Sequence, residues 1–239
     1  MDMIPCASRE GLTLRQQAED ALRTAIATGR FLPGQRLTDR ELTELLGVAR
    51  STVREAVRQL ESEGLITTIP FRGPIVATLG REEARDLYEL RAILEGEAGR
   101  LCAERGTSEH FAAMMQALDA LRSAAQAGEV SAMMTATADF YRAMLDGAGN
   151  GALRQSIAGL QSRLAIFRFS ATKYPGRMEQ ALPRLNDIAE AITARDGAAA
   201  RAACIRHIQG AAELALFLIE ERAKGALAAR RRRTEQGSK

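Results

Sequence analysis

Arginine residues near the start of the chain occur at spacings that suit nucleic-acid binding. Arg50 and Arg54 are four residues apart, so they share one face of a helix. A guanidinium group can bind guanine O6 and N7 through two hydrogen bonds, or it can hold a phosphate. Ser51 and Thr52 fall in the same turn and offer hydroxyl groups. This spacing favours a DNA-reading surface over the alternative, in which both arginines are solvated surface charges paired with nearby carboxylates.

Three further residues extend this candidate surface. Arg40 lies in the first turn of the helix expected before Arg50, where such a helix crosses the DNA backbone. Arg72 and Gly73 lie between two short β-branched runs, at the expected tip of a hairpin. Because glycine has no Cβ, it permits close approach of the backbone to a groove. We therefore expect Arg72 and Gly73 to reach the minor groove.

The spacing of apolar residues predicts the elements that position these side chains. Helices are expected over residues 14–28, between Thr38 and Gly47, and over residues 50–63. Period-two runs at residues 65–69 and 75–79 then predict the two strands of the hairpin. Three helices and a hairpin within about 80 residues describe a winged helix-turn-helix, whose third helix enters the major groove.

The rest of the chain shows only helical periodicity, from residue 81 to about residue 224. Glycine and proline breaks divide it into six expected helices, at residues 81–104, 108–127, 131–146, 150–170, 177–194 and 196–224. Such a set forms an all-α bundle. The predicted fold is therefore mostly α, with a winged helix-turn-helix at 1–80, an all-helical domain at 81–224, and a basic disordered tail at 225–239.

The net charge of +3 and the isoelectric point near 9.0 carry less weight than they first suggest. Residues 1–80 hold equal numbers of basic and acidic side chains, and the positive excess lies in the last 18 residues. A basic tail of this kind is typical of a solvated or weakly phosphate-binding segment. The inference to DNA therefore rests on the placed arginines and not on the overall charge.

Composition and motif content exclude several classes of protein. Three scattered cysteines form no disulfide framework, which favours a reducing cytoplasm. The first residues lack the apolar core of a signal peptide, and no uninterrupted apolar run approaches the ~18 residues of a membrane helix. The sequence contains no nucleophile elbow, CxxC, HExxH or P-loop. We expect a non-enzymatic cytoplasmic protein, associated with the nucleoid and not with a membrane.

The first 80 residues resemble the GntR family of bacterial transcription regulators. The matching segments are residues 22–26, 29, 33–37, 40–42, 46–48, 50–60, 63–65 and 72–73. The resemblance implies that the DNA contacts fall on Arg40, Arg50, Ser51, Thr52, Arg54, Arg72 and Gly73. It also implies a homodimer on a palindromic double-stranded operator. One departure is Ala49, where the family usually has Ser or Thr, so a hydroxyl that could cap the helix is missing.

The second region resembles the ligand-sensing FCD domain of the FadR subfamily. The matching segments are residues 88–95, 140–142, 148–150, 191–192, 195–196 and 207. In many such domains an Asp and three His hold a divalent metal, and those positions fall here on Thr137, Tyr141, Leu185 and His207. Only His207 is retained, and one His cannot supply the three or four protein ligands of a zinc-type site. We therefore predict no metal cofactor.

Arg91 is the strongest candidate for an effector contact. It interrupts the apolar stripe formed by Leu87, Leu90 and Leu94, which places it toward the interior of the bundle. A buried arginine needs an anionic partner. In the resembling domains this position helps to hold a carboxylate ligand, and the alternative is a salt bridge to Glu95. The predicted effector-binding residues are Arg91, Thr137, Tyr141, Leu185 and His207.

Together these patterns predict a ligand-responsive repressor of a metabolic operon, with a small carboxylate as its effector. One alternative is a metal-free constitutive DNA-binding protein that has no small-molecule effector. A second alternative is an enzyme whose bundle hosts catalysis, which the missing catalytic constellations disfavour.

Overall fold

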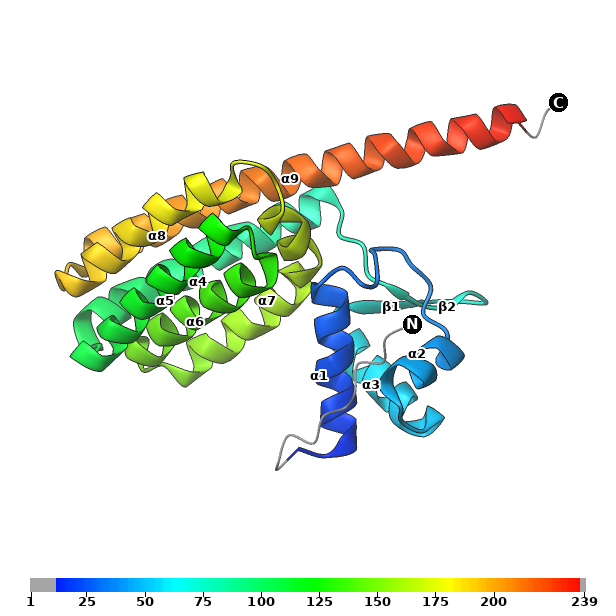
Figure 1. The fold of residues 1–239 in the computed structure, drawn as a ribbon, viewed down its shortest axis with the longest axis horizontal. Coiled ribbons are helices and arrows are strands. Elements are labelled where there is room, and N and C mark those ends of the chain that lie inside the picture. The colour runs from blue at the N-terminus through cyan, green and yellow to red at the C-terminus, as the bar shows by residue number, and fades with distance from the viewer. Residues whose placement is uncertain (1–11, 237–239) are drawn as a thin grey trace. The chain divides into compact units, whose positions relative to one another are not determined.

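The structure is a computed structural model that describes residues 12–236, without the side chains of residues 166–170 and 226–236 (Figure 1). Up to Thr78, the described residues form one compact unit together with Gly159–Phe169. Leu79–Ala158 and the described residues from Ser170 onward form the other. We call them the head unit and the bundle unit. The prediction of a mostly α chain with a winged helix-turn-helix followed by a helical bundle is confirmed.

The head unit contains three helices and a hairpin. The helices are α1 (Leu14–Ala27), α2 (Asp39–Leu46) and α3 (Arg50–Ser62), followed by β1 (Ile66–Ile69) and β2 (Gly73–Val76). Their apolar faces meet in a common core, because each helix carries its buried residues at three- and four-residue spacing. The largest of these core side chains are Leu22, Ile26, Leu37, Leu42, Leu45, Leu46, Leu60, Leu65 and Ile66.

Side-chain caps set the ends of the first two helices. Thr13 and Gln16 cap the start of α1 reciprocally, which the sequence reading did not anticipate. Thr38 accepts a hydrogen bond from the Glu41 amide at 3.2 Å and so begins α2. Gly47 ends α2 with a φ of 66°, a left-handed conformation that favours glycine. This sharp stop separates α2 from α3.

The hairpin differs slightly from the predicted one. Its strands pair antiparallel, with Ile66 opposite Val76 and Ile69 opposite Gly73. The second strand therefore begins two residues earlier than predicted and ends at Val76. The turn holds only residues 70–72, and it is closed by a 3.1 Å hydrogen bond from the Arg72 amide to the Ile69 carbonyl. The left-handed Gly73, with a φ of 81°, leads directly into β2.

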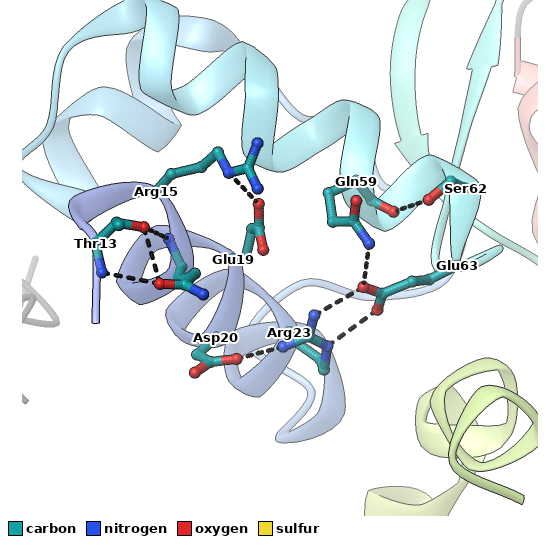
Figure 2. A network of polar contacts seen from close by, with 9 residues as sticks. Thr13, Arg15, Glu19, Asp20, Arg23, Gln59, Ser62 and Glu63 are labelled. Carbon is teal, nitrogen blue, oxygen red and sulfur yellow. Dashed lines mark hydrogen bonds and ion pairs between the residues drawn. The ribbon is translucent and has the colours of Figure 1, made fainter. Parts of the chain in front are cut away.

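A polar network joins the first and third helices of the head unit (Figure 2). Arg23 on α1 donates to both carboxylate oxygens of Glu63, the residue that ends α3, at 3.0 and 2.8 Å. It also pairs with Asp20, while Gln59 donates to Glu63 at 3.1 Å. Burial alone would raise the pKa of Glu63, but these bonds hold it below its ordinary value. The network fixes the angle of α3 against α1.

The bundle unit follows the predicted helical pattern. Its helices are α4 (Arg81–Arg105), α5 (Ser108–Ala127), α6 (Val130–Ala148), α8 (Arg177–Thr193) and α9 (Gly197–Gln236), and α7 (Gly151–Thr172) joins α6 to α8. Figure 1 shows α4, α5, α6, α8 and α9 lying alongside one another. Their core centres on buried residues that include Phe140, Met114, Leu118, Ile188 and Ile192.

Small residues bring α4 and α9 into close contact. A Cβ built on Gly99 would lie 2.6 Å from Cys204 Sγ and 3.3 Å from the Ala200 carbonyl oxygen, both on α9. A Cβ on Gly96 would lie 3.1 Å from Ile205. Any larger side chain at Gly99 would separate the helices. This close approach brings the middle of α4 next to the middle of α9.

The final helix differs from its prediction in two respects. It continues through Gln236, whereas the sequence reading ended it at residue 224 and called residues 225–239 a disordered tail. Alanine, leucine and arginine are strong helix formers, and Gly225 alone does not stop the helix. Residues 237–239 lie outside the described residues. By length and composition the segment Gly197–Gly225 could also cross a membrane, but one such helix is weak evidence for a span, and α9 packs on α4 and α8.

We expect Glu63→Gln to destabilise the head unit by roughly 1 kcal/mol, because the partly buried Arg23 guanidinium loses one of its two charged acceptors and keeps only Asp20. Amide hydrogen exchange of α1 and α3 measures the effect. The matched control is Glu44→Gln, whose carboxylate pairs with Arg40 on the exposed surface of α2. Equal protection in the two variants would contradict a role for the Arg23–Glu63 contact.

Candidate functional site

Helix α3 presents the predicted DNA-reading residues on its outer face. Its inner face is fixed by the buried residues Val53, Ala56, Val57 and Leu60. This orientation leaves the side chains of Arg50, Ser51 and Arg54 exposed and that of Thr52 half-buried. Ala49 begins the helix with extended backbone and no side-chain cap, as its residue type predicts. The amides of the first turn are therefore left for another hydrogen-bond acceptor, such as a DNA phosphate.

The ion pairs on this surface are weak enough to be exchanged for phosphate. Arg54 donates to Asp39 at 3.1 Å and Arg40 donates to Glu44 at 2.9 Å, with the arginine side chains 67% and 85% exposed. Exposed pairs of this kind contribute little to stability. A phosphate or a guanine edge can replace either carboxylate at small cost.

The hairpin turn adds an exposed residue that sequence reasoning missed. Arg72 is exposed and Gly73 is half-buried, with no atom near the position that a Cβ would occupy. Beside them, Phe71 is fully exposed and adopts a φ of 62°, which is unusual for an aromatic residue. An aromatic residue within the Pro70–Gly73 turn was the available signal. An apolar side chain in this position can contact sugars or bases in the minor groove.

In the bundle unit, Arg91 lies in the interior and pairs with Glu95, one turn further along α4. Arg91 Nε lies 2.7 Å from Glu95 Oε1, and both side chains are buried. The rings of Tyr88 and Tyr141 lie 5.8 and 5.6 Å from the guanidinium carbon. Burial alone would lower the pKa of Arg91, but the Glu95 carboxylate holds it above its ordinary value. The predicted alternative, a salt bridge between Arg91 and Glu95, is therefore present. It is buried and lies beside the rings of two tyrosines.

His207 of α9 lies near Tyr141, with the two ring centroids 6.3 Å apart. It is 4% exposed, and its Nδ1 atom has no hydrogen-bond partner among the described residues. Burial and the positive charges of Arg177, Arg91 and Arg184 lower its pKa to about 3. The imidazole is therefore neutral in the folded protein at neutral pH, and it can donate or accept one hydrogen bond with a ligand.

The other two predicted effector-binding residues, Thr137 and Leu185, have their contacts within the bundle unit. The Thr137 hydroxyl donates to the Met133 carbonyl at 2.8 Å, within its own helix. Leu185 is 2% exposed and belongs to the apolar core. Within the described part of the chain, no group of three His, Cys, Asp or Glu residues could hold a metal ion. The metal-free state stays a prediction.

Two arginines of α8 join this region, and sequence reasoning missed both. Arg177 and Arg184 are half-buried, and their charges act on His207 together with that of Arg91. Burial lowers the pKa of Arg177, and the like charges of Arg184 and Arg91 contribute to the same effect. A signal was available, because the seven-residue spacing places both arginines on one helix face beside the buried Ala181 and Leu185.

Comparison with known proteins gives the chain its family. Residues 86–210 match the model of the FCD domain, and residues 14–76 match that of the bacterial regulatory proteins of the gntR family. The chain belongs to the GntR family. The FCD match places it among the GntR regulators that carry a helical effector domain of the FadR type. The chain is therefore a transcriptional regulator of the GntR/FCD type.

Individual relatives are similar to this chain over much of its length. The HTH-type regulator Rv0494 of Mycobacterium tuberculosis is 30% identical over 224 residues, covering 83% of this chain and 89% of that protein. The Nta operon transcriptional regulator of Aminobacter aminovorans is 33% identical over 141 residues, covering 58% and 66%. Among solved structures, Escherichia coli McbR/YncC superposes with a TM-score of 0.77 at 21% identity, covering 89% of this chain and 99% of that one. The last likeness shows the shared fold.

The buried, neutral His207 predicts how the stability of this GntR protein depends on pH. Its pKa of about 3 in the folded state lies below the ordinary value of 6.5, so the unfolded chain binds the proton first. Stability is therefore fully present above pH 6.5 and falls as the pH drops below it, by roughly 1 kcal/mol per pH unit. His207→Gln removes this dependence, and urea unfolding at pH 7, 6 and 5 compares the two proteins. Parallel profiles would contradict the buried neutral state.

Proposed function

We propose that this chain is a cytoplasmic, homodimeric repressor that binds a palindromic operator on the nucleoid and releases it when a small organic anion binds the bundle unit. In this proposal the two heads contact half-sites about one helical turn apart. The observation that carries the DNA proposal is the exposed arginine face of α3, oriented by four buried residues. The curated relatives support the regulatory role, since one is named a probable D-xylose utilization operon transcriptional repressor, from Paenarthrobacter nicotinovorans.

Each head residue has a distinct task in this proposal. Arg50 and Arg54 read guanine edges or hold phosphates in the major groove, with Ser51 and Thr52 beside them. Arg40 contacts the DNA backbone. Arg72, Gly73 and the newly recognised Phe71 form the part of the hairpin that enters the minor groove.

We expect Arg54→Ala to weaken operator binding at least tenfold, in line with the roughly 1–3 kcal/mol carried by one bidentate arginine. The measurement is fluorescence anisotropy with a duplex that the wild-type protein selects from a random-sequence library. Arg122→Ala is the control, because Arg122 is an exposed arginine of α5 that pairs with an aspartate in a similar way. Unchanged affinity of the Arg54 variant would remove α3 from the reading role.

The effector proposal rests on Arg91, Tyr141 and His207, which meet inside the bundle unit. A buried arginine between two rings, with a neutral imidazole nearby, suits the recognition of a carboxylate. The bundle binds this molecule and does not transform it, as expected of a relative of transcriptional regulators. The alternative is a constitutive DNA-binding protein, in which Arg91 forms a salt bridge with Glu95 and contacts no effector.

A thermal-shift screen with small organic acids separates these alternatives. We expect at least one acid to raise the unfolding temperature of the wild-type protein, since binding to the folded state alone stabilises it by mass action. The same acid should weaken operator binding. Arg91→Gln should lose both effects. Unfolding temperatures and operator affinity that no acid alters would favour the constitutive alternative.

A further inference from the structure

The bundle unit holds more buried positive charge than its own carboxylates balance. Arg91 lies against the Tyr141 ring, and Arg184 lies against α9 at Gly210, close in sequence to His207. Both guanidinium groups and that of Arg177 are near enough to act electrostatically on His207. We call these three arginines the guanidinium cluster. The carboxylate bonded within this cluster is Glu95, which already pairs with Arg91. Two positive charges therefore remain without a bonded carboxylate among the described side chains.

The environment of Arg184 shows how unusual this arrangement is. Its Nη1 atom is buried and has no hydrogen-bond partner among the described residues. The side chain crosses α9 at Gly210, where a Cβ would overlap Nη1. Gly210 comes one turn after His207, so the missing side chain leaves the space through which Arg184 enters the region. The backbone of α9 thus accommodates a guanidinium whose buried Nη1 atom has no hydrogen-bond partner among the described residues.

Arg177, two turns before Arg184 on α8, is a second arginine without a bonded carboxylate. It is half-buried and forms no ion pair with any described carboxylate. Desolvation and the like charges of Arg184 and Arg91 lower its pKa, so its charge is held at a cost in the absence of an anion. Folded proteins pair or hydrogen-bond their buried charges. An unpaired set of this kind is expected where a ligand supplies the missing negative charge.

We propose that the guanidinium cluster recognises a small dianion, whose negatively charged oxygens contact Arg177 and Arg184 as well as Arg91. Two unbalanced positive charges match two negative charges, whereas a monocarboxylate would leave one guanidinium unsatisfied. The dianion is a dicarboxylate or a phosphate monoester, because both present planar or tetrahedral oxygens that a guanidinium fork can bind. This inference deepens the effector role proposed above and rests on it.

The first test compares matched ligands on the full-length wild-type protein by calorimetry and thermal shift. The pairs are succinate with butyrate, and glycerol 3-phosphate with glycerol, with inorganic phosphate as a further probe. We expect at least one dianion to bind tenfold or more tightly than its matched partner. Preference for succinate or for the phosphate ester identifies the source of the dianion. Butyrate that binds as tightly as both dianions would overturn the proposal.

The second test uses variants that separate binding from structure. Arg177→Gln and Arg184→Gln should lose at least tenfold in dianion affinity while their unliganded unfolding temperatures stay level or rise, because an uncompensated charge is removed. A merely structural arginine would instead lower that temperature. Gly210→Ala should weaken dianion binding by displacing Arg184 without changing any charge. Arg206→Gln, an exposed position on α9, is the control. Full dianion affinity in both arginine variants would overturn the proposal.

These outcomes also distinguish dianion recognition from the broader effector role on which it rests. Tight binding of a monocarboxylate that depends on Arg91 but not on Arg184 would retain the effector role and reject the dianion. Binding of none of the probes, together with intact operator binding, would reject this inference, and failure of the wider organic-acid screen would then reject the effector role as well.

Discussion

Uncompensated positive charge inside the bundle unit is the constraint on which its other features depend. Removing a guanidinium from water is costly unless an anion or a polar partner replaces the water. Glu95 does this for Arg91, and the rings of Tyr88 and Tyr141 add their electron-rich faces. The pKa of His207 is lowered by burial and, in addition, by the nearby positive charges of Arg177, Arg91 and Arg184, so its imidazole stays neutral. The same charges that would repel a proton from His207 would attract an anion.

The head unit also depends on arginines, but these arginines are exposed to solvent. Arg40 and Arg54 are exposed, and their pairs with Glu44 and Asp39 cost little to break. A surface of this kind suits DNA, because the phosphates exchange with weak internal partners without leaving a buried charge unpaired. The overall charge of residues 1–80 is balanced, so position on α3 matters more than the amount of charge. The Arg23–Glu63 contact supports this position by fixing α3 against α1.

Periodicity predicted the helices well because their buried faces follow from spacing alone. Helices α4 to α8 begin and end within about two residues of the predicted positions, where glycine and proline interrupt the pattern. The strand β2 was misplaced, since its pairing depends on the tight turn at residues 70–72 and not on β-branched residues. The end of α9 was misplaced because a charged run was taken for disorder, whereas its alanines and arginines favour helix.

Prediction of the site was less complete, for a physical reason. Arg91 stood out because it interrupts an apolar stripe within one helix. Arg177 and Arg184 did not, since their significance depends on which helix α8 meets and on the missing side chain at Gly210. Contacts between helices distant in sequence cannot be derived from the spacing within either one.

Chain connectivity gives the bundle a direct route to the head. Helix α4 carries Arg91 and Glu95, and it begins at Arg81, only a few residues after β2 ends at Val76. Arg81 pairs with Glu220 of α9, the helix that also carries His207, so both helices that form the site are joined at this end. In the proposed effector role, a ligand that draws the Arg91 guanidinium away from Glu95 would act on the helix pair α4 and α9, which the Arg81–Glu220 ion pair joins.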